Sequence, residues 1–363
     1  MSEPVKTGQP LSATQTLIDT SAAPKRGLPR WLRGNDAIIF AVLIVVILVA
    51  SISVKNFAST LTVGFLLIQI VPIILIAMPM ALVIISGEID LSVASTAGLT
   101  SAVMGVLWRD SGMDIWVVMA LCLLVGVAAG AFNGFLITTL GLPSLAVTIG
   151  TLALYRGLAL VVIGDGKVSN FPAELTALST AKIGTTGIPV VMILVLVVIA
   201  FFAVLLHFTP FGRGLYALGF SKEAATFVGI RVGHAKFWLF VATGVVSSLV
   251  GVFWTLRFAS AGPDNATGIE LSVIAAVLLG GVSIFGGKGS IPGVVAGVLL
   301  IGTLTYALRL AKVPETTLVI VTGALLVISV VAPSLTGWIR ERIRLTRVRR
   351  EVQRLSTSGQ TSA

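Results

Sequence analysis

The side chains that could do chemistry in this chain are a small set of charged and hydrogen-bonding groups within or beside long apolar runs. Ionisable groups at the edge or in the middle of a bilayer are costly, and this favours a role in binding a polar solute or an ion. We interpret the set as a candidate pathway for such a solute. Its members are Glu88, Asp90, Ser92, Asn133, Tyr155, Arg156 and Glu270.

Several of these residues also have a structural alternative. Asp90 and Glu270 stand near expected helix starts, where a carboxylate can cap free N–H groups and meet the positive end of the helix dipole. Asn133 can join two helices by hydrogen bonds. Arg156 either extends to the outer membrane surface or faces a wet cavity.

A second set lies in the polar loop 209–236, between two apolar runs. Its central part, residues 221–230, reads S-K-E-A-A-T-F-V-G-I. The small side chains suit a short helix that packs tightly into a groove on a partner, with charged contacts at the rim. The alternative is a loop that only anchors the membrane edge. We predict that this loop receives mechanical work from the partner and transmits it to the membrane helices, which we call a coupling role. The residues to which we assign it are Ser221, Glu223, Ala224, Ala225, Gly229, Ile230 and Arg231.

Catalytic motifs are missing from the sequence. Residues 281–290 read G-V-S-I-F-G-G-K-G-S, which comes nearest to a phosphate-binding loop. Five residues rather than four separate Gly281 from Gly287, and Gly289 replaces the Ser or Thr that would contact magnesium. We interpret this segment as a tight turn with Lys288 as a membrane anchor. Since no Cys/His cluster or nucleophile–base arrangement is found either, we expect no enzyme activity, no metal and no cofactor bound by this chain.

The composition is typical of a polytopic membrane protein. Hydrophobic residues make up 56% of the chain and charged residues 11%, whereas a soluble domain carries about 25% charged residues. The net charge of +10 could suggest nucleic acid, but Lys and Arg cluster at the termini and in the 209–236 loop. That placement indicates membrane orientation instead. We therefore expect lipid around the chain and no nucleic-acid partner.

The apolar runs predict an all-α fold with about ten transmembrane helices, because a bilayer span needs roughly 20 mostly apolar residues. Residues 1–36 are expected to form a disordered cytoplasmic tail, 37–336 the transmembrane domain and 337–363 a basic cytoplasmic tail. The predicted spans are 37–54, 62–85, 92–108, 115–138, 144–163, 188–208, 237–256, 270–286, 291–308 and 316–336.

The distribution of basic residues orients these spans. With the N-terminus in the cytoplasm, seventeen of the 25 Lys and Arg residues lie on the cytoplasmic side, seven lie outside and Arg156 lies within a span. Basic residues resist translocation. We therefore place both termini and the 209–236 loop in the cytoplasm, and the 164–187 loop outside.

Three sequence patterns suggest how the spans are arranged. Residues 89–93 read I-D-L-S-V and residues 269–273 read I-E-L-S-V. Because five predicted spans separate the copies, the pattern predicts an inverted repeat with the pathway at its interface, although five matching positions could also arise by chance.

Small residues at four-residue spacing let helices approach closely, either within the chain or between subunits. They are Gly126, Gly130 and Gly134, and Gly293 and Gly297. Pro72 and Pro79 predict a kinked span, which either packs in the core or lines the pathway.

The motifs resemble one known family. Residues 223–230 are similar to the EAA loop of ATP-binding-cassette importer permeases. Residues 86–93, S-G-E-I-D-L-S-V, resemble the G-G-I-D-L-S-V-G signature of the ribose-type sugar permeases. The stretches 148–157 and 278–290 are similar to the T-L-G-T…R-G and L-G-G-x-S…G-G-x-G segments of that family, which also includes branched-chain amino acid permeases.

The resemblance implies a permease subunit that imports a monosaccharide or sugar-like solute across a bacterial plasma membrane. It implies as partners a second permease, identical or different, a cytoplasmic ATPase that binds ATP and magnesium, and an extracytoplasmic solute-binding protein. Glu88 and Ala94 stand where the family commonly has glycine, and Ser221-Lys222 replaces the more common Gly-Asn. The form with Glu88 is similar to rhamnose-type or autoinducer-2-type permeases. The alternative function is an ion-coupled secondary transporter of a small polar solute, with Asp90 or Glu88 as the ion site.

Overall fold

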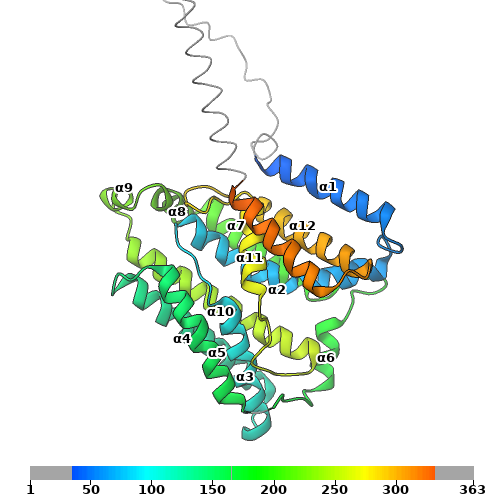
Figure 1. The fold of residues 1–363 in the computed structure, drawn as a ribbon. Helices are drawn as coiled ribbons and strands as arrows, with labels where there is room; N and C mark the ends of the chain where they lie inside the picture. The colour runs from blue at the N-terminus through cyan, green and yellow to red at the C-terminus, as the bar shows by residue number, and fades with distance from the viewer. Residues whose placement is uncertain (1–34, 165, 332–363) are drawn as a thin grey trace, which may run out of the picture.

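The computed structural model describes residues 35–164 and 166–331, so most of the two predicted tails, 1–36 and 337–363, lies outside the described residues. The described part is helical, with two isolated β-bridges, which confirms the all-α prediction (Figure 1). A further helix without a label, Glu315–Val331, follows the labelled ones. The labelled helices are α1 (Asn35–Ser53), α2 (Thr60–Ile85), α3 (Val93–Ser111), α4 (Ile115–Thr138), α5 (Ser144–Ile163), α6 (Ala173–Thr180), α7 (Met192–Phe208), α8 (Pro210–Phe220), α9 (Lys222–Phe227), α10 (Val232–Phe258), α11 (Ile269–Leu279) and α12 (Ile291–Leu310).

Five of the described helices are long and apolar enough to cross a membrane: α2, α4, α5, α10 and α12. A sixth span results only if α7 and α8 are taken together, although they meet at an angle of 69°. The predicted spans 115–138 and 144–163 coincide with α4 and α5. The chain is therefore a polytopic helical membrane protein, with fewer full-length spans in the described residues than the ten predicted.

Most predicted ends are shifted by a few residues, as in α10, which begins at Val232 instead of 237, and two regions differ more than that. The expected span 270–286 is wrong, because α11 has only 11 residues and ends at Leu279. Gly280 approaches the backbone of α12, with its hypothetical Cβ 2.6 Å from the Val294 Cα, and Gly281 has a positive φ of 86°, so the helix stops where only glycine fits. The loop 164–187, which the sequence analysis placed outside the membrane, contains α6.

Two long, buried helices organise the core. α10 packs against α4, α3 and α2, and α2 packs against α12, α11 and α7. Each is followed by one copy of the repeated sequence pattern, 89–93 after α2 and 269–273 after α10. The packing is crossed between the two copies. α10 packs against α4, the second helix after residues 89–93, and α2 packs against α12, the second helix after residues 269–273.

The glycine motifs pack within the chain. A Cβ on Gly126 would overlap the Gly244 carbonyl oxygen, and a Cβ on Gly130 would overlap the Phe240 carbonyl oxygen, so α4 and α10 cross with their backbones in contact. Gly297 of α12 makes the same close approach to Ala276 of α11. This confirms the intramolecular interpretation of both motifs, because small residues are what close helix crossings require.

The carbonyl group that Pro72 leaves free in α2 has a specific partner. Pro72 lacks an N–H, so the Ile68 carbonyl four residues earlier has no partner within the helix. The Arg257 guanidinium, in the last turn of α10, donates to that oxygen at 3.1 Å. Pro72 and Pro79 are both buried, so this part of α2 packs in the core. The arginine thus joins the two central helices by satisfying the carbonyl that the proline leaves free.

We predict that Arg257→Leu destabilises the chain by about 1–3 kcal/mol, the cost of a buried acceptor left without a donor. Pro72→Ala restores an N–H that can reach Ile68. Arg257→Leu should therefore cost about 1 kcal/mol less in the Pro72→Ala background than in the wild type. Denaturant unfolding in detergent of all four proteins measures this difference, and equal costs in both backgrounds would contradict the assignment.

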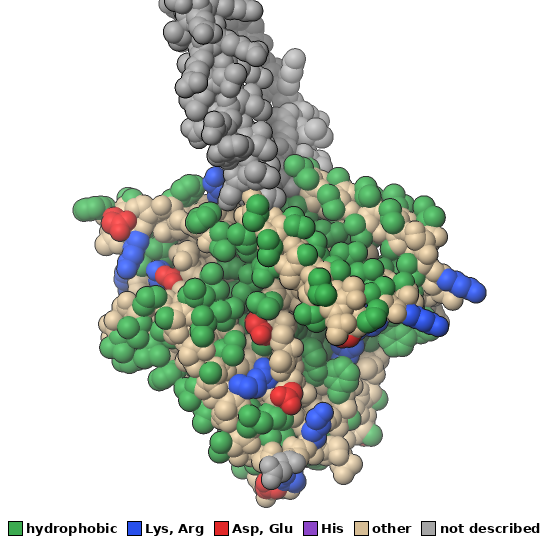
Figure 2. All heavy atoms as spheres, viewed as in Figure 1, with side chains coloured by type: hydrophobic (Ala, Val, Ile, Leu, Met, Phe, Trp, Pro, Cys, Tyr) green, Lys and Arg blue, Asp and Glu red, His purple; other side chains and the backbone are tan. Residues whose placement is uncertain are grey.

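The outer surface suits lipid. Figure 2 shows apolar side chains over most of the visible face, with few charges among them. Outward-facing residues of α4, α5 and α7 include Leu124, Val161 and Phe201, all exposed.

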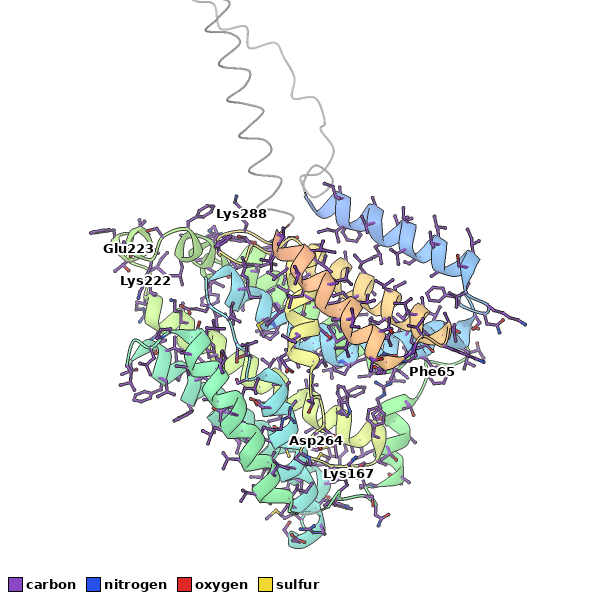
Figure 3. All side chains as sticks on the ribbon, viewed as in Figure 1. Phe65, Lys167, Lys222, Glu223, Asp264 and Lys288 are labelled. Atoms are coloured by element: carbon purple, nitrogen blue, oxygen red, sulfur yellow. The ribbon has the colours of Figure 1, made fainter. Side chains whose placement is uncertain are left out.

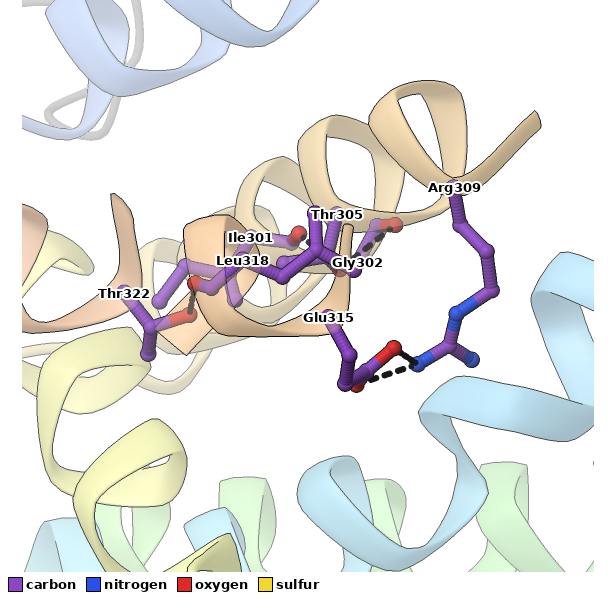
Figure 4. A network of polar contacts seen from close by, with 7 residues as sticks. All are labelled: Ile301, Gly302, Thr305, Arg309, Glu315, Leu318 and Thr322. Carbon is purple, nitrogen blue, oxygen red and sulfur yellow. Dashed lines mark hydrogen bonds and ion pairs between the residues drawn. The ribbon is translucent and has the colours of Figure 1, made fainter. Parts of the chain in front are cut away.

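An ion pair joins the end of α12 to the helix Glu315–Val331. Arg309 donates to both carboxylate oxygens of Glu315 at 2.8 and 3.0 Å (Figure 4). That pair is exposed and contributes little to stability.

Candidate functional site

The connection between α2 and α3 carries the first polar centre. Asp90 is 98% buried, and three hydrogen bonds reach its carboxyl group. The Ser92 N–H donates to Oδ1 at 2.9 Å and the Ser92 hydroxyl donates to the same oxygen at 2.6 Å. The Thr243 hydroxyl of α10 lies 2.6 Å from Oδ2. Asp90 therefore binds Ser92, the N-cap residue of α3, and joins this connection to α10, whereas the predicted bonds to free N–H groups of the first helical turn are not found among the described residues.

The network continues across α4 and α5. The Asn133 amide donates to the Ser92 hydroxyl at 2.8 Å. The Tyr155 hydroxyl lies 2.9 Å from the Ala129 carbonyl oxygen and 3.3 Å from the Asn133 amide oxygen. All of these side chains are buried, so four of the seven candidate pathway residues form one connected network inside the bundle. The sequence alone did not indicate Thr243, because an isolated threonine in a long apolar run has no distinguishing pattern.

The other carboxylate of this connection has a different partner. Glu88 forms an ion pair with Lys236, which lies in the second turn of α10, and both side chains are mostly buried. Glu88 and Asp90 therefore both face α10, two residues apart. The backbone between them contacts α5, because the Ser144 hydroxyl accepts from the Ile89 N–H at 3.3 Å and the Thr148 hydroxyl donates to the Ile89 carbonyl at 3.3 Å.

Arg156 and Glu270 lie away from this network, around the 259–268 connection. Arg156 donates to the carbonyl oxygens of Pro263 and Asn265, so its head binds the chain instead of extending to the membrane surface. Glu270 is in the first turn of α11, and its Oε2 is buried without a hydrogen-bond partner among the described residues. The capping bond we expected for Glu270 is therefore not made. Figure 3 shows Asp264 and Lys167 on this side of the molecule, far from Lys222 and Glu223.

The 209–236 loop folds into two short helices, α8 and α9, at one end of the molecule (Figure 1). Ser221 caps α9, since its hydroxyl oxygen accepts from the Ala224 N–H at 3.1 Å. The Glu223 carboxylate is next to its own backbone N–H and the Ser221 hydroxyl, which hold the pKa of Glu223 below its ordinary value. Gly229 ends the segment with a positive φ of 82°, a conformation that glycine adopts without strain.

The surface that α9 presents differs from the expected one. Ala225 is fully buried against its own chain, so its tight packing is internal. Ala224 and Arg231 are exposed, and Ile230 is half-buried. The large exposed side chains are Phe227, 92% exposed, and Val228, 74% exposed. A groove of about 340 Å³ runs beside them, lined by Lys222, Glu223, Thr226 and Phe227. We refer to Lys222–Arg231 as the coupling surface.

Helix α8, which directly precedes the coupling surface, is joined closely to the core. Gly219, near the end of α8, leaves no room for a Cβ because the Ile85 carbonyl oxygen and the Gly287 nitrogen lie against it. Gly287 donates to that same Ile85 oxygen at 2.9 Å, and the Tyr216 hydroxyl donates to the Gly289 carbonyl at 2.8 Å. Lys288, which lies between Gly287 and Gly289 in the segment 281–290, is at the same end of the molecule as Lys222 (Figure 3). A displacement of α8 would therefore act directly on the end of α2.

The described residues thus form a helical membrane domain in which α8 contacts the end of the central helix α2. The family model described as "Branched-chain amino acid transport system / permease component" matches residues 62–330, more than half of the chain. The chain belongs to this permease family. This confirms the resemblance to ATP-binding-cassette importer permeases, which are transport components.

Permeases of autoinducer 2 import systems are among the similar proteins. The autoinducer 2 import system permease protein LsrD of Klebsiella pneumoniae is 35% identical over 276 residues, which cover 73% of this chain and 82% of the relative. LsrD of Photorhabdus luminescens is 34% identical over 269 residues, 72% of this chain and 80% of the relative. LsrC of Yersinia enterocolitica is 35% identical over 242 residues, 67% of this chain and 66% of the relative. No solved structure matches the chain.

Proposed function

We propose that this chain is a permease subunit of an importer for autoinducer-2, a furanosyl sugar-like solute, and that a separate ATPase drives it through the coupling surface. The observation that carries the proposal is the contact of Gly219 with Ile85 and Gly287, because it links the exposed α8–α9 segment to the central helix α2. The similarity to LsrD and LsrC supports the solute. Ribose or rhamnose remains the alternative solute class.

The proposed topology has ten spans in a bacterial inner membrane, with both termini and the coupling surface in the cytoplasm. The helices α1, α3, α7, α11 and Glu315–Val331 would complete the count. An inverted repeat is supported by equivalent contacts in the two halves of the chain: the helix before each copy of the repeated pattern packs against the second helix after the other copy, α10 on α4 and α2 on α12. The polar network of Asp90, Ser92, Asn133 and Tyr155, together with Glu270 and Arg156, would border the pathway when the helices separate.

The proposed partners are a cytoplasmic ATP-binding subunit, an extracytoplasmic solute-binding protein and a second permease. The first would contact Phe227 and Val228, since an exposed apolar patch rimmed by charges is typical of a protein interface. The relatives carry two permease names, LsrC and LsrD, and this supports a pair of different permeases. ATP and magnesium would be bound by the ATPase.

Two variants test the coupling assignment. Glu223→Lys reverses the charge beside the groove, and Gly229→Trp introduces a large side chain where the backbone needs a positive φ. We expect each to lower solute-stimulated ATP hydrolysis by at least ten-fold, measured with autoinducer-2 and its binding protein in proteoliposomes, while the chain still inserts. Val161→Ala, on the exposed apolar face of α5, is the matched control. Normal stimulation in both variants would overturn the assignment.

A further inference from the structure

The loop formed by residues 86–92 is held by one face of α10 at two points. Lys236 pairs with Glu88, and Thr243 binds Asp90 at 2.6 Å. Lys236 and Thr243 are seven residues apart, so they lie two helical turns apart on the same side of α10. Glu88 and Asp90, two positions apart in the loop, thus both bind the same face of α10.

The contacts of this loop with α5 are weaker than its contacts with α10. The two hydrogen bonds between Ile89 and α5 are both 3.3 Å long and neutral. The bond to Thr243 is much shorter, and the pair with Lys236 is charged and largely removed from solvent, with 12% of the Lys236 side chain and 15% of the Glu88 side chain exposed. Charge-assisted bonds are roughly twice as strong as neutral ones. If α10 and α5 separate, the loop will follow α10.

α10 begins at the coupling surface. Arg231 precedes its first residue, and Lys236 lies in the second turn. The helix then runs without a break past Thr243 into the core. A displacement imposed on Arg231 and its neighbours therefore reaches Glu88 and Asp90 through a single rigid element.

We propose that Glu88 is a positioning residue for energy coupling: its ion pair with Lys236 makes the 86–92 loop, and with it the Asp90 network, move with α10. The inference rests on the proposed function, because it assumes that an ATPase acts on the coupling surface. Breaking the pair would leave both partner proteins bound and ATP hydrolysis active, while less of that hydrolysis would drive solute movement. Glu88 thus acts through α10 and needs no contact with the solute.

The test is a charge exchange in the complete importer. Wild type, Glu88→Gln, Lys236→Met and the double variant Glu88→Lys/Lys236→Glu are reconstituted in proteoliposomes with the ATPase and the binding protein. The measured quantity is ATP hydrolysed per molecule of autoinducer-2 imported. Lys288→Met, which removes an exposed basic residue at the same end of the molecule, is the matched control.

We expect each single variant to raise the ratio of hydrolysis to import by about five- to ten-fold, and the double variant to return it to within about two-fold of the wild type. Lys288→Met should leave it unchanged. A purely structural pair would lower import and hydrolysis together at a constant ratio, and that result would overturn the proposal. So would wild-type ratios in both single variants.

A second measurement separates this inference from the proposed solute. If the wild type imports no autoinducer-2, the solute assignment fails, and coupling is then measured by hydrogen exchange of residues 86–92 in the assembled complex with and without ATP. ATP should change this exchange in the wild type and in the double variant, and the change should be absent in Glu88→Gln and Lys236→Met. An equal response in all four proteins would overturn the role of Glu88.

Discussion

Asp90→Ala is expected to lower the free energy of unfolding by about 2–4 kcal/mol and to reduce solute uptake by more than ten-fold. The variant removes the acceptor of the buried Ser92 N–H and hydroxyl, and each donor left unpaired costs about 1–3 kcal/mol. Thr243 loses its contact with Asp90 but can still donate to the Phe240 carbonyl oxygen. The effect should extend to Asn133, since the Ser92 hydroxyl that it binds would lose its orientation. Thermal unfolding in detergent and uptake into proteoliposomes measure the two quantities.

Asp90→Asn is the matched variant. The asparagine oxygen can still accept from Ser92, and its amide can donate to the Thr243 hydroxyl, whose own proton then serves the Phe240 carbonyl 2.8 Å away. We therefore expect a stability loss below about 1 kcal/mol. If uptake also stays near the wild-type level, the residue acts by hydrogen bonding. If stability is kept and uptake is lost, the acidic group itself is needed for transport. A loss of stability as large as that of the alanine variant would contradict the network.

Gly130→Leu is expected to prevent correct folding. Its side chain would meet the Phe240 carbonyl oxygen and the Val241 Cα, both of them backbone atoms that no rotamer change can move. The crossing of α4 and α10 would have to open, which separates the Asn133 side of the network from the Thr243 side. Overpacking typically costs about 1–3 kcal/mol and more when the backbone is involved. The amount of monodisperse protein on size-exclusion chromatography after membrane extraction is the readout.

Gly150→Leu is the control for this prediction. Gly150 lies on α5 with no atom within 4 Å of its hypothetical Cβ, so leucine there should extend into lipid. It should leave the yield within about two-fold of the wild type, because a lipid-facing leucine is favourable in a membrane helix. Equal yields for Gly130→Leu and Gly150→Leu would show that the α4–α10 crossing is not as tight as described.

Hydropathy predicted the helices well because burial in a bilayer is a local property of each run. The ends of α4 and α5 were predicted to the residue, whereas 270–286 was placed beyond the end of α11. That error has a physical cause. Residues 280–286 are apolar enough to continue a helix, but the helix ends because Gly280 contacts α12 and Gly281 adopts a positive φ, and neither constraint is visible in hydropathy.

The sequence was enough to predict which residues belong to the candidate site. It was not enough to predict which of those residues contact one another. Asp90, Ser92, Asn133 and Tyr155 were identified because polar groups in apolar runs stand out. That they form one network, while Arg156 and Glu270 lie elsewhere, depends on how the helices pack. The coupling loop was found from its charge and its small residues, but the amphipathic turn of α9 buries Ala225 and exposes Phe227.

The sequence by itself determined that this chain is a helical membrane protein, which segment is polar enough to meet a partner, and which permease family its motifs resemble. These follow from composition and from short contiguous patterns. Only the tertiary structure decided which groups meet: Thr243 and Asp90 are 153 positions apart, Lys236 and Glu88 are 148 apart, and Arg257 reaches Ile68 over 189. A local pattern shows which face of a helix is apolar or polar, but the partner of that face depends on how the whole bundle packs.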